Sequence, residues 1–127
     1  MNKDKLNWRL PTKDELNLIY ENLYKKGVGG FDNEFYWSSS EGNSNNVWYQ
    51  YFFNGFQNGS NKNGIKRVRA VCTFHSKAGG DLYKIGEEIT RGFVFDIQDD
   101  MIFICKKEDE SDLMTWGEAM EEFGGKK

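Results

Sequence analysis

Residues 42–65 limit the possible folds more than any other part of the chain, because nearly all of them are Asn, Ser, Gly or large aromatics. Val47 and Ile65 are the only aliphatic residues in this stretch. A strand that only fills a core is rich in Val, Ile and Leu, whereas a disordered linker lacks aromatics such as Trp48 and Phe52. Aromatic anchors set among Asn, Ser and Gly are typical of antibody combining loops. The stretch therefore predicts a binding face that a small folded scaffold displays.

The length and charge of the chain exclude few classes of protein. Its 127 residues suit one domain with a single core, and we expect residues 1–127 to form that domain, with residues 75–81 as a connecting linker. The net charge of −3 gives no electrostatic reason to expect a nucleic acid partner. No signal peptide opens the chain, and no apolar run approaches the about 18 residues of a transmembrane helix. We therefore expect no membrane insertion.

Two helices are predicted by their capping signals. In residues 7–27, Thr12 can cap the N-terminus while Glu15 completes a capping box, and Gly27 supplies a left-handed stop. Near the other end of the chain, Thr115 and Glu118 repeat the same box. The apolar stripes at helical spacing are Leu16, Ile19, Tyr20 and Leu23 in the first helix, and Trp116, Ala119, Met120 and Phe123 in the second.

Strands are predicted on both sides of the aromatic stretch. Alternation in a strand over residues 47–53 puts Tyr49, Tyr51 and Phe53 on one face. Residues 54–64, rich in Gly and Asn, predict tight turns, whereas residues 66–74 alternate as a central strand does. Residues 92–97 and 101–105 predict a hairpin, followed by a charged loop at residues 106–112. Two helices and about five strands make an α+β domain.

Few residues have the spacing of a catalytic or metal site. Ser38, Ser39 and Ser40 resemble a nucleophile cluster, but without a nearby base they are better explained as hydrogen-bond partners of turn backbone. Cys72 and Cys105 lie among apolar residues, which is consistent either with two reduced, buried thiols or with a disulfide. Their spacing matches no metal motif, so we expect no metal and no cofactor.

Three phrases of the sequence occur together in one family. They are WRLPT at residues 8–12, YWSSSE at 36–41 and VRAV at 68–71. In them the chain resembles the bacterial and phage DUF1566 or Lcl-type domains of the C-type-lectin-like fold, relatives of retroelement-diversified variable proteins such as the phage major tropism determinant. The resemblance covers most of the chain. It implies two helices around a twisted, mainly antiparallel sheet that binds a protein or glycan ligand, at a bacterial cell surface or on a phage particle.

In the diversified relatives, mutated asparagine codons are interspersed with a fixed framework, and residues 42–65 resemble such a segment. By this resemblance the framework is Trp48, Gln50, Phe52, Gly55, Gln57, Lys62, Arg67 and Val68. Ser44 and Ile65 are among the varied positions, and the other varied positions form the predicted ligand-binding set. This set is Asn43, Asn45, Asn46, Tyr49, Tyr51, Phe53, Asn54, Phe56, Asn58, Ser60, Asn61 and Asn63.

The order of the elements departs from the family. The segment like residues 92–95 and the helix like residues 115–120 normally precede the WRLPT phrase, whereas here they follow the VRAV strand. Joining Lys127 to Met1 restores the usual order, with residues 75–81 as the new bridge. We therefore interpret the chain as circularly permuted, with a tandem-repeat fragment or an exchange of halves between copies as alternatives.

Three alternative functions remain for a chain of this resemblance. Formylglycine-generating oxidoreductases of the same broad fold use a reactive cysteine pair, but Cys72 and Cys105 lack the electropositive surroundings that activate thiols, so we expect no enzyme. Calcium-dependent animal lectins use a proline-containing loop motif that is missing here, although Asp99, Asp100 and the acidic residues of 108–112 offer oxygen ligands. A purely structural module of a surface or phage protein is the third alternative.

Overall fold

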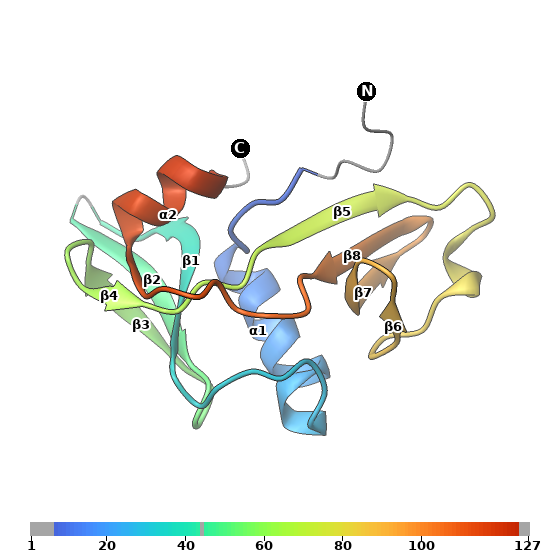
Figure 1. Cartoon of the computed structure of the whole chain (residues 1–127), viewed down its shortest axis with the longest axis horizontal. Coiled ribbons are helices and arrows are strands. Elements are labelled where there is room, and N and C mark those ends of the chain that lie inside the picture. The colour runs from blue at the N-terminus through green and yellow to red at the C-terminus, as the bar shows by residue number, and fades with distance from the viewer. Residues whose placement is uncertain (1–6, 44, 125–127) are drawn as a thin grey trace.

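The computed structural model of the protein describes residues 7–43 and 45–124. In that part of the chain, α1 (Lys13–Asn22) lies between two antiparallel sheets, and α2 (Trp116–Phe123) packs over one end of the first sheet (Figure 1). The architecture is α+β, as predicted. Neither α-helix within these residues is long and apolar enough to cross a membrane.

The first sheet has the strand order β1-β2-β3 and is antiparallel throughout. Beyond β1, the backbone of Arg67 continues the pairing in parallel, because its N–H donates to Phe35 O at 2.9 Å and its carbonyl accepts from Trp37 N at 3.1 Å. A short two-stranded sheet then joins β4 to β9 next to α2. These strands are β1 (Phe35–Glu41), β2 (Asn46–Tyr51), β3 (Phe56–Asn61), β4 (Ile65–Lys66) and β9 (Met114–Thr115).

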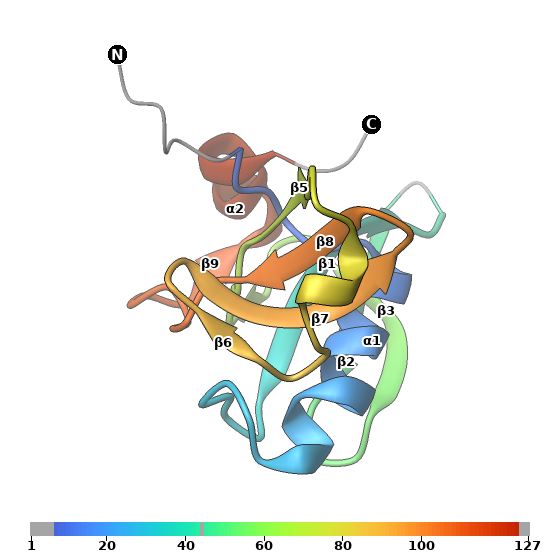
Figure 2. The same ribbon diagram turned by 90° about the vertical axis from the view of Figure 1, so that its right-hand side faces the viewer.

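The second sheet has the order β5-β8-β7-β6, and Figure 2 views it with α1 behind it. The predicted hairpin is confirmed as β7 and β8, whose turn holds Asp99 at a left-handed φ of 56°. The strands are β5 (Val71–His75), β6 (Glu88–Ile89), β7 (Gly92–Gln98) and β8 (Met101–Cys105). The described residues also form the short 3-10 helices η1 (Tyr24–Lys26) and η2 (Gly80–Leu82).

The largest core cluster joins α1 to both sheets. Three residues of the predicted helical stripe, Leu16, Ile19 and Leu23, are fully buried, whereas the fourth, Tyr20, packs at the margin. Because α1 packs against both sheets, it joins them into one hydrophobic core. The partners of the stripe are Tyr36 and Phe52 from the first sheet and its turn, and Val71, Phe95, Phe103 and Cys105 from the second.

Both capping boxes are confirmed. Glu15 N–H donates to Thr12 Oγ1 at 3.1 Å while Thr12 N–H donates to Glu15 Oε1 at 2.9 Å, and Thr115 and Glu118 make the same reciprocal pair at α2. The helix begins after Thr12, as the predicted cap requires, but the segment assigned to it, residues 7–27, extends beyond α1 on both sides. Residues 7–11 are extended, because Pro11 lacks an N–H and disfavours helical backbone before it. At the other end α1 stops at Asn22, before η1.

Two of the strand predictions are also wrong in their extent. The strand expected over residues 47–53 ends at Tyr51, because residues 52–55 turn around Gly55, which has a φ of 83°. The turns expected over residues 54–64 instead contain the six-residue strand β3. Every residue of β3 pairs with β2, so neighbouring backbone imposes the strand on a sequence with little intrinsic preference for it.

The strand predicted over residues 66–74 is divided in two. Between β4 and β5 the chain passes through residues 67–70, where Arg69 is buried and hydrogen-bonds to the carbonyls of Gly29 and Lys106 at 2.8 and 2.9 Å. The expected linker at residues 75–81 is folded as well. Its Ser76 is buried and its N–H donates to Asp100 O at 2.8 Å.

Candidate functional site

The first sheet has one face toward α1 and the other partly toward α2. Side chains alternate along a strand, so Tyr36 and Gln50 face α1 while Trp37 and Tyr49 face the opposite side. On the α1 side, Gln50 Nε2 donates to Asn17 Oδ1 at 2.9 Å and to Gly55 O at 3.1 Å. This side of the sheet is closed by the helix and its amide contacts.

Aromatic rings occupy the half of the opposite face that α2 does not reach. We call the rings of Phe35, Tyr49, Tyr51, Phe53 and Phe56 the aromatic face. Phe35 stacks on Tyr51 with 4.3 Å between centroids and 19° between planes, and Tyr49 meets Phe35 edge-on at 5.4 Å. Phe53 lies 5.7 Å from Tyr51, and Phe56 is the cross-strand partner of Tyr51. The phenylalanines at 35, 53 and 56 are 38%, 63% and 52% exposed, which for neighbouring rings is typical of an interaction surface.

One cation stands at the border between the aromatic face and the part covered by α2. Lys66 Nζ lies 4.7 Å from the ring centre of Tyr49, 4.9 Å from that of Trp37 and 5.2 Å from that of Phe35. Ring faces attract cations, and Lys66 is therefore held over three of them. Partial burial lowers the pKa of Lys66 from its ordinary value.

The structure does not bring all the predicted ligand-binding residues together. Tyr49, Tyr51, Phe53 and Phe56 belong to the aromatic face, and Asn58 and Ser60 lie on β3 beside it. Asn54 lies in the turn after β2. The others lie at the far end of the sheet, where Asn43 and Asn45 are in the loop before β2, Asn46 pairs with Asn61, and Asn63 is in the turn after β3. Ser44 lies outside the described residues.

Several of these asparagines also have a local structural role. Asn54 Oδ1 accepts from Phe56 N at 3.0 Å, and Asn61 Oδ1 accepts from Asn63 N at 2.7 Å. Asn43 and Asn58 make the same kind of bond to Asn45 N and Gly59 N. Asparagine carbonyls commonly stabilise turns in this way, so part of the asparagine content serves the backbone of the loops.

The residues assigned to the framework all have contacts within the chain. A Cβ at Gly55 would lie 2.5 Å from the ring of Tyr20, and Gln57 Nε2 donates to Lys13 O at 2.9 Å. Phe52 and Val68 are fully buried. The other contacts are Trp48 under Lys13 Nζ, Gln50 to Asn17, Lys62 to Glu41 and Arg67 to Asp32.

Phe35 and Lys66 belong to this site although the sequence did not single them out. Phe35 precedes the YWSSSE phrase and is placed in the aromatic face only by its pairing with Tyr51. Lys66 arrives from β4, which is not paired with β1, β2 or β3. Phe35 could have been predicted only by assuming that β1 and β2 pair as a hairpin, which places it opposite Tyr51. No local sequence pattern predicts the position of Lys66.

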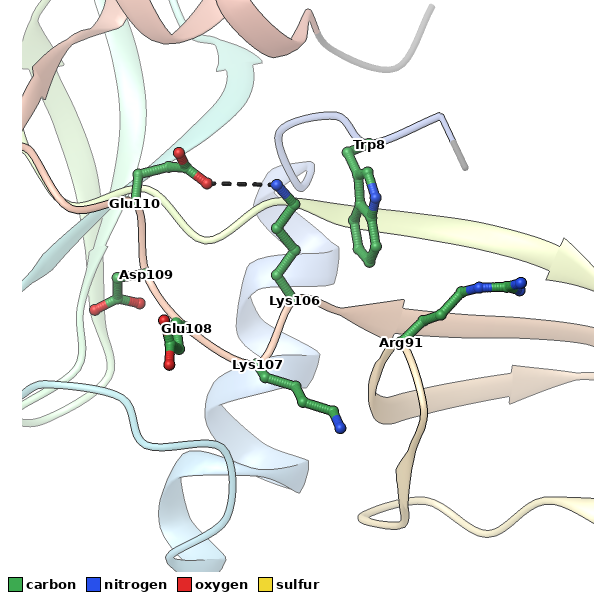
Figure 3. A pocket seen from close by; sticks show the side chains of 7 residues that line it. All are labelled: Trp8, Arg91, Lys106, Lys107, Glu108, Asp109 and Glu110. Carbon is green, nitrogen blue, oxygen red and sulfur yellow. Dashed lines mark ion pairs between the residues drawn. The ribbon is translucent and has the colours of Figure 1, made fainter. Parts of the chain in front are cut away.

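A separate hollow of about 540 Å³ is lined mainly by the charged loop that follows β8 (Figure 3). Trp8 forms one wall, and Lys106 reaches between it and Glu110, with 3.6 Å between Nζ and Oε2. Lys107 pairs with Glu88 at 3.1 Å. The lining carries both signs of charge and its lysines are paired, so it does not select an ion of either sign. The lining residues are Trp8, Arg91, Lys106, Lys107, Glu108, Asp109 and Glu110.

Three of the acidic residues considered for calcium, Asp100, Asp109 and Glu110, have partners within the chain. Asp109 accepts from buried Arg69 and from the hydroxyl of Tyr36, each at 2.7 Å, and Asp100 lies 2.6 Å from His75 Nε2. In residues 7–43 and 45–124, His, Cys, Asp and Glu side chains form no group of three or more that could hold a metal ion.

The two cysteines are free and lie on opposite faces of the second sheet. Cys105 is directly opposite Val71 and shares its cluster, whereas Cys72 packs with Val94 and Ile104. Of the two states considered from sequence, the structure has the buried thiols and not the disulfide. Burial raises the pKa of each thiol to about 11, so neither is activated as a nucleophile. Ser38 Oγ donates to Trp48 O in β2, and Ser40 Oγ accepts from Lys13 N at the start of α1, so both hydroxyls bond to backbone but not to that of a turn.

The raised thiol pKa values predict a loss of stability in alkali. Folded thiols stay protonated up to about pH 11, whereas unfolded thiols ionise from their ordinary value of 9.0. The unfolded state therefore binds fewer protons in this window, and the free energy of unfolding falls as pH rises from about 9 to about 11. Urea denaturation across this range should give a shallower fall for Cys72→Ala/Cys105→Ala than for the wild type. Equal slopes in the two proteins would contradict the assignment.

The part of the chain that builds the aromatic face matches a known family. The family model of the Lcl C-terminal domain matches residues 2–72, which is more than half of the 127 residues. This range contains α1, β1 to β4 and Lys66. No curated protein and no solved structure matches the chain. The chain therefore belongs to the Lcl C-terminal domain family.

Proposed function

We propose that this domain is a ligand-recognition module that binds a protein or a glycan through the aromatic face. The observation that carries the proposal is that Phe35, Phe53 and Phe56 remain exposed around the half-buried Tyr51, whose ring contacts those of Phe35 and Phe53 and whose cross-strand partner is Phe56. The opposite face of the same strands is closed by α1. Exposed neighbouring rings favour aggregation unless a partner covers them, so they point to a binding role.

The mechanism is equilibrium recognition without chemistry. Aromatic rings lose water against the partner while the exposed amides of Asn54 and Asn58 supply polar contacts at the rim. A few buried anchors commonly dominate such an interface, each costing about 2 kcal/mol or more on truncation. Tyr51, Phe53 and Phe56 are the anchors in this proposal, because the ring of Phe53 contacts that of Tyr51 and Phe56 is the cross-strand partner of Tyr51.

The proposal is tested by removing three rings at once. A biotinylated chain, tetramerised on streptavidin, is screened on a printed glycan array and on an array of purified cell-surface proteins. For the ligand found, Tyr51→Ala/Phe53→Ala/Phe56→Ala should weaken binding by at least about 100-fold. The matched control is Leu82→Ala/Ile85→Ala, which removes equally exposed apolar side chains far along the chain and should leave affinity unchanged. Full binding by the triple variant, with an unchanged circular dichroism spectrum, would place the binding site elsewhere.

Two alternatives fit the site less well. A formylglycine-generating oxidoreductase needs a reactive cysteine pair, and the two thiols here lie on opposite sides of a sheet. A purely structural module of a bacterial surface or phage protein does not account for the exposed rings.

We further propose that the scaffold is C-type-lectin-like, diversified by a retroelement and circularly permuted. The permutation is supported by the hydrogen bond from Leu10 N to Gly124 O, 2.8 Å long, which holds the two ends of the described chain together; the Lys127 to Met1 junction lies outside the described residues. A variant in which Lys127 is joined to Met1 and the chain instead begins at Ala78 and ends at Lys77 should fold. An adjacent near-copy of the coding DNA for residues 42–65, with adenines at the varied codons, is expected for the retroelement. An experimental structure with another topology would contradict the lectin-like scaffold.

A further inference from the structure

We propose that the partner of the aromatic face is an acidic protein segment, in which an Asp or Glu carboxylate pairs with Lys66 and neighbouring apolar side chains cover the rings. The inference rests on the proposed function and deepens it, because it names the chemistry of the partner. It is drawn from the position of Lys66 and from the pairing of the charges around it.

Lys66 is the uncompensated charge of this face. Among the described residues, Lys66 Nζ has no carboxylate oxygen within the 4.0 Å of an ion pair, and its ammonium is surrounded by the rings of Tyr49, Trp37 and Phe35. The neighbouring cations differ. Lys62 pairs with Glu41 at 2.9 Å, and Arg67 pairs with Asp32 at 3.2 Å. One positive charge therefore remains on a surface otherwise built of rings and amides.

The surroundings of Lys66 make a carboxylate the favoured counterpart. Ring faces attract the ammonium but supply no oxygen acceptors for its three N–H donors. Lys66 is half-buried among these rings, so part of its hydration water is displaced, and its pKa is lowered. A carboxylate that arrives with the partner restores charge-assisted hydrogen bonds in a low-dielectric setting, where such bonds are strongest.

The arrangement of the rings indicates how the partner lies. Phe56, Tyr51 and Phe35 are register partners on β3, β2 and β1, and Lys66 follows on the segment beyond β1. Neighbouring strands are about 4.8 Å apart, so the row of three rings spans about 10 Å and ends at the ammonium. An extended peptide advances about 3.3 Å per residue, so three or four residues place a carboxylate at one end and apolar side chains along the row. A polyanionic glycan would need several cations, whereas this row offers one.

Two synthetic peptides that differ only in charge test the inference. Acetyl-Asp-Phe-Phe-amide and acetyl-Asn-Phe-Phe-amide are titrated into the ¹⁵N-labelled chain and followed by ¹H–¹⁵N correlation spectra. The acidic peptide should shift the amide signals of Phe35, Tyr51 and Lys66 with an affinity at least about tenfold higher than the neutral one, an effect expected of one charge pair. Added salt should weaken only the acidic peptide.

Matched variants locate the effect on Lys66. Lys66→Met, which keeps the length of the side chain, should abolish the difference between the two peptides, whereas Lys66→Arg and Lys62→Met should retain it. Unchanged signals from β7 and β8 show that each variant is folded.

Equal affinity of the wild type for both peptides would overturn the carboxylate inference while leaving the aromatic face as a binding site. The absence of shifts with either peptide, or tighter binding of a sulfated heparin hexasaccharide at the same signals, would overturn it as well. The triple ring variant tested above decides the proposed function independently of these results.

Discussion

Truncating Phe52 to alanine is expected to lower the free energy of unfolding by about 3–5 kcal/mol, the usual cost of removing a buried aromatic ring. Phe52 is fully buried where the turn after β2 meets α1. Its ring lies 4.5 Å from that of Tyr36, 5.4 Å from those of Tyr24 and Phe31, and 5.6 Å from that of Tyr20. A cavity at this point removes contacts from four rings at once, and surrounding rings held by helix and sheet cannot close it.

The adjacent residue provides a matched control of the same chemistry. Phe53 is 63% exposed and contacts the ring of Tyr51 at 5.7 Å, so Phe53→Ala should change stability by less than about 0.5 kcal/mol. Urea denaturation followed by tryptophan fluorescence measures both variants under the same conditions. Similar losses for the two would mean that Phe53 belongs to the core and not to the aromatic face. The predicted contrast assigns Phe52 to the core and its neighbour Phe53 to the aromatic face.

The second large effect is expected at Arg69. Arg69→Met should destabilise the fold by about 3–5 kcal/mol, because removing one member of a buried ion pair leaves the other charge without a partner. The Arg69 side chain is 0% exposed, and its Nε donates to Asp109 Oδ1 at 2.7 Å. Its other donors satisfy the carbonyls of Gly29, Gly30 and Lys106, and its guanidinium lies 3.9 Å above the ring of Phe31. The substitution removes all these bonds while keeping the apolar stem.

Arg67 is the control for that prediction, because it lies two residues before Arg69 and directly before the VRAV phrase. It pairs with Asp32 at 3.2 Å, but the two side chains are 30% and 53% exposed, and such pairs contribute about 1 kcal/mol or less. Arg67→Met should therefore shift the urea midpoint only slightly. If Arg67→Met lowered the free energy of unfolding as much as Arg69→Met, the prediction would be contradicted. The buried hydrogen bonds of Arg69 would then not be what holds residues 28–31 against residues 106–110.

The helices and the β7–β8 hairpin were accessible from sequence because the interactions that define them are local. A capping box joins residues three apart, so Thr12 with Glu15 and Thr115 with Glu118 are readable without any tertiary information. The aromatic surface was accessible in part for the same reason, since alternation along one strand places Tyr49 and Tyr51 together.

The strand limits and the full site depended on contacts between distant parts of the chain. β3 is a strand because β2 lies beside it, not because Gly, Asn and Ser favour one. The strand predicted through Arg69 is broken because that guanidinium turns inward to carbonyls some 40 residues away on each side in the sequence. Lys66 enters the aromatic face from β4, which no periodicity connects to β2.

By itself, the sequence determined the class of fold, both helix starts, the hairpin and the aromatic character of one surface, because short-range capping and alternation are encoded within a few residues. Only the tertiary structure decided which rings of that surface remain exposed and that α2 covers the Trp37 end of the sheet. It also decided that Lys66 lies among the rings without a carboxylate partner from residues 7–43 or 45–124. Exposure and charge pairing are set by what packs nearby in space, and the neighbours concerned are separated by tens of residues along the chain.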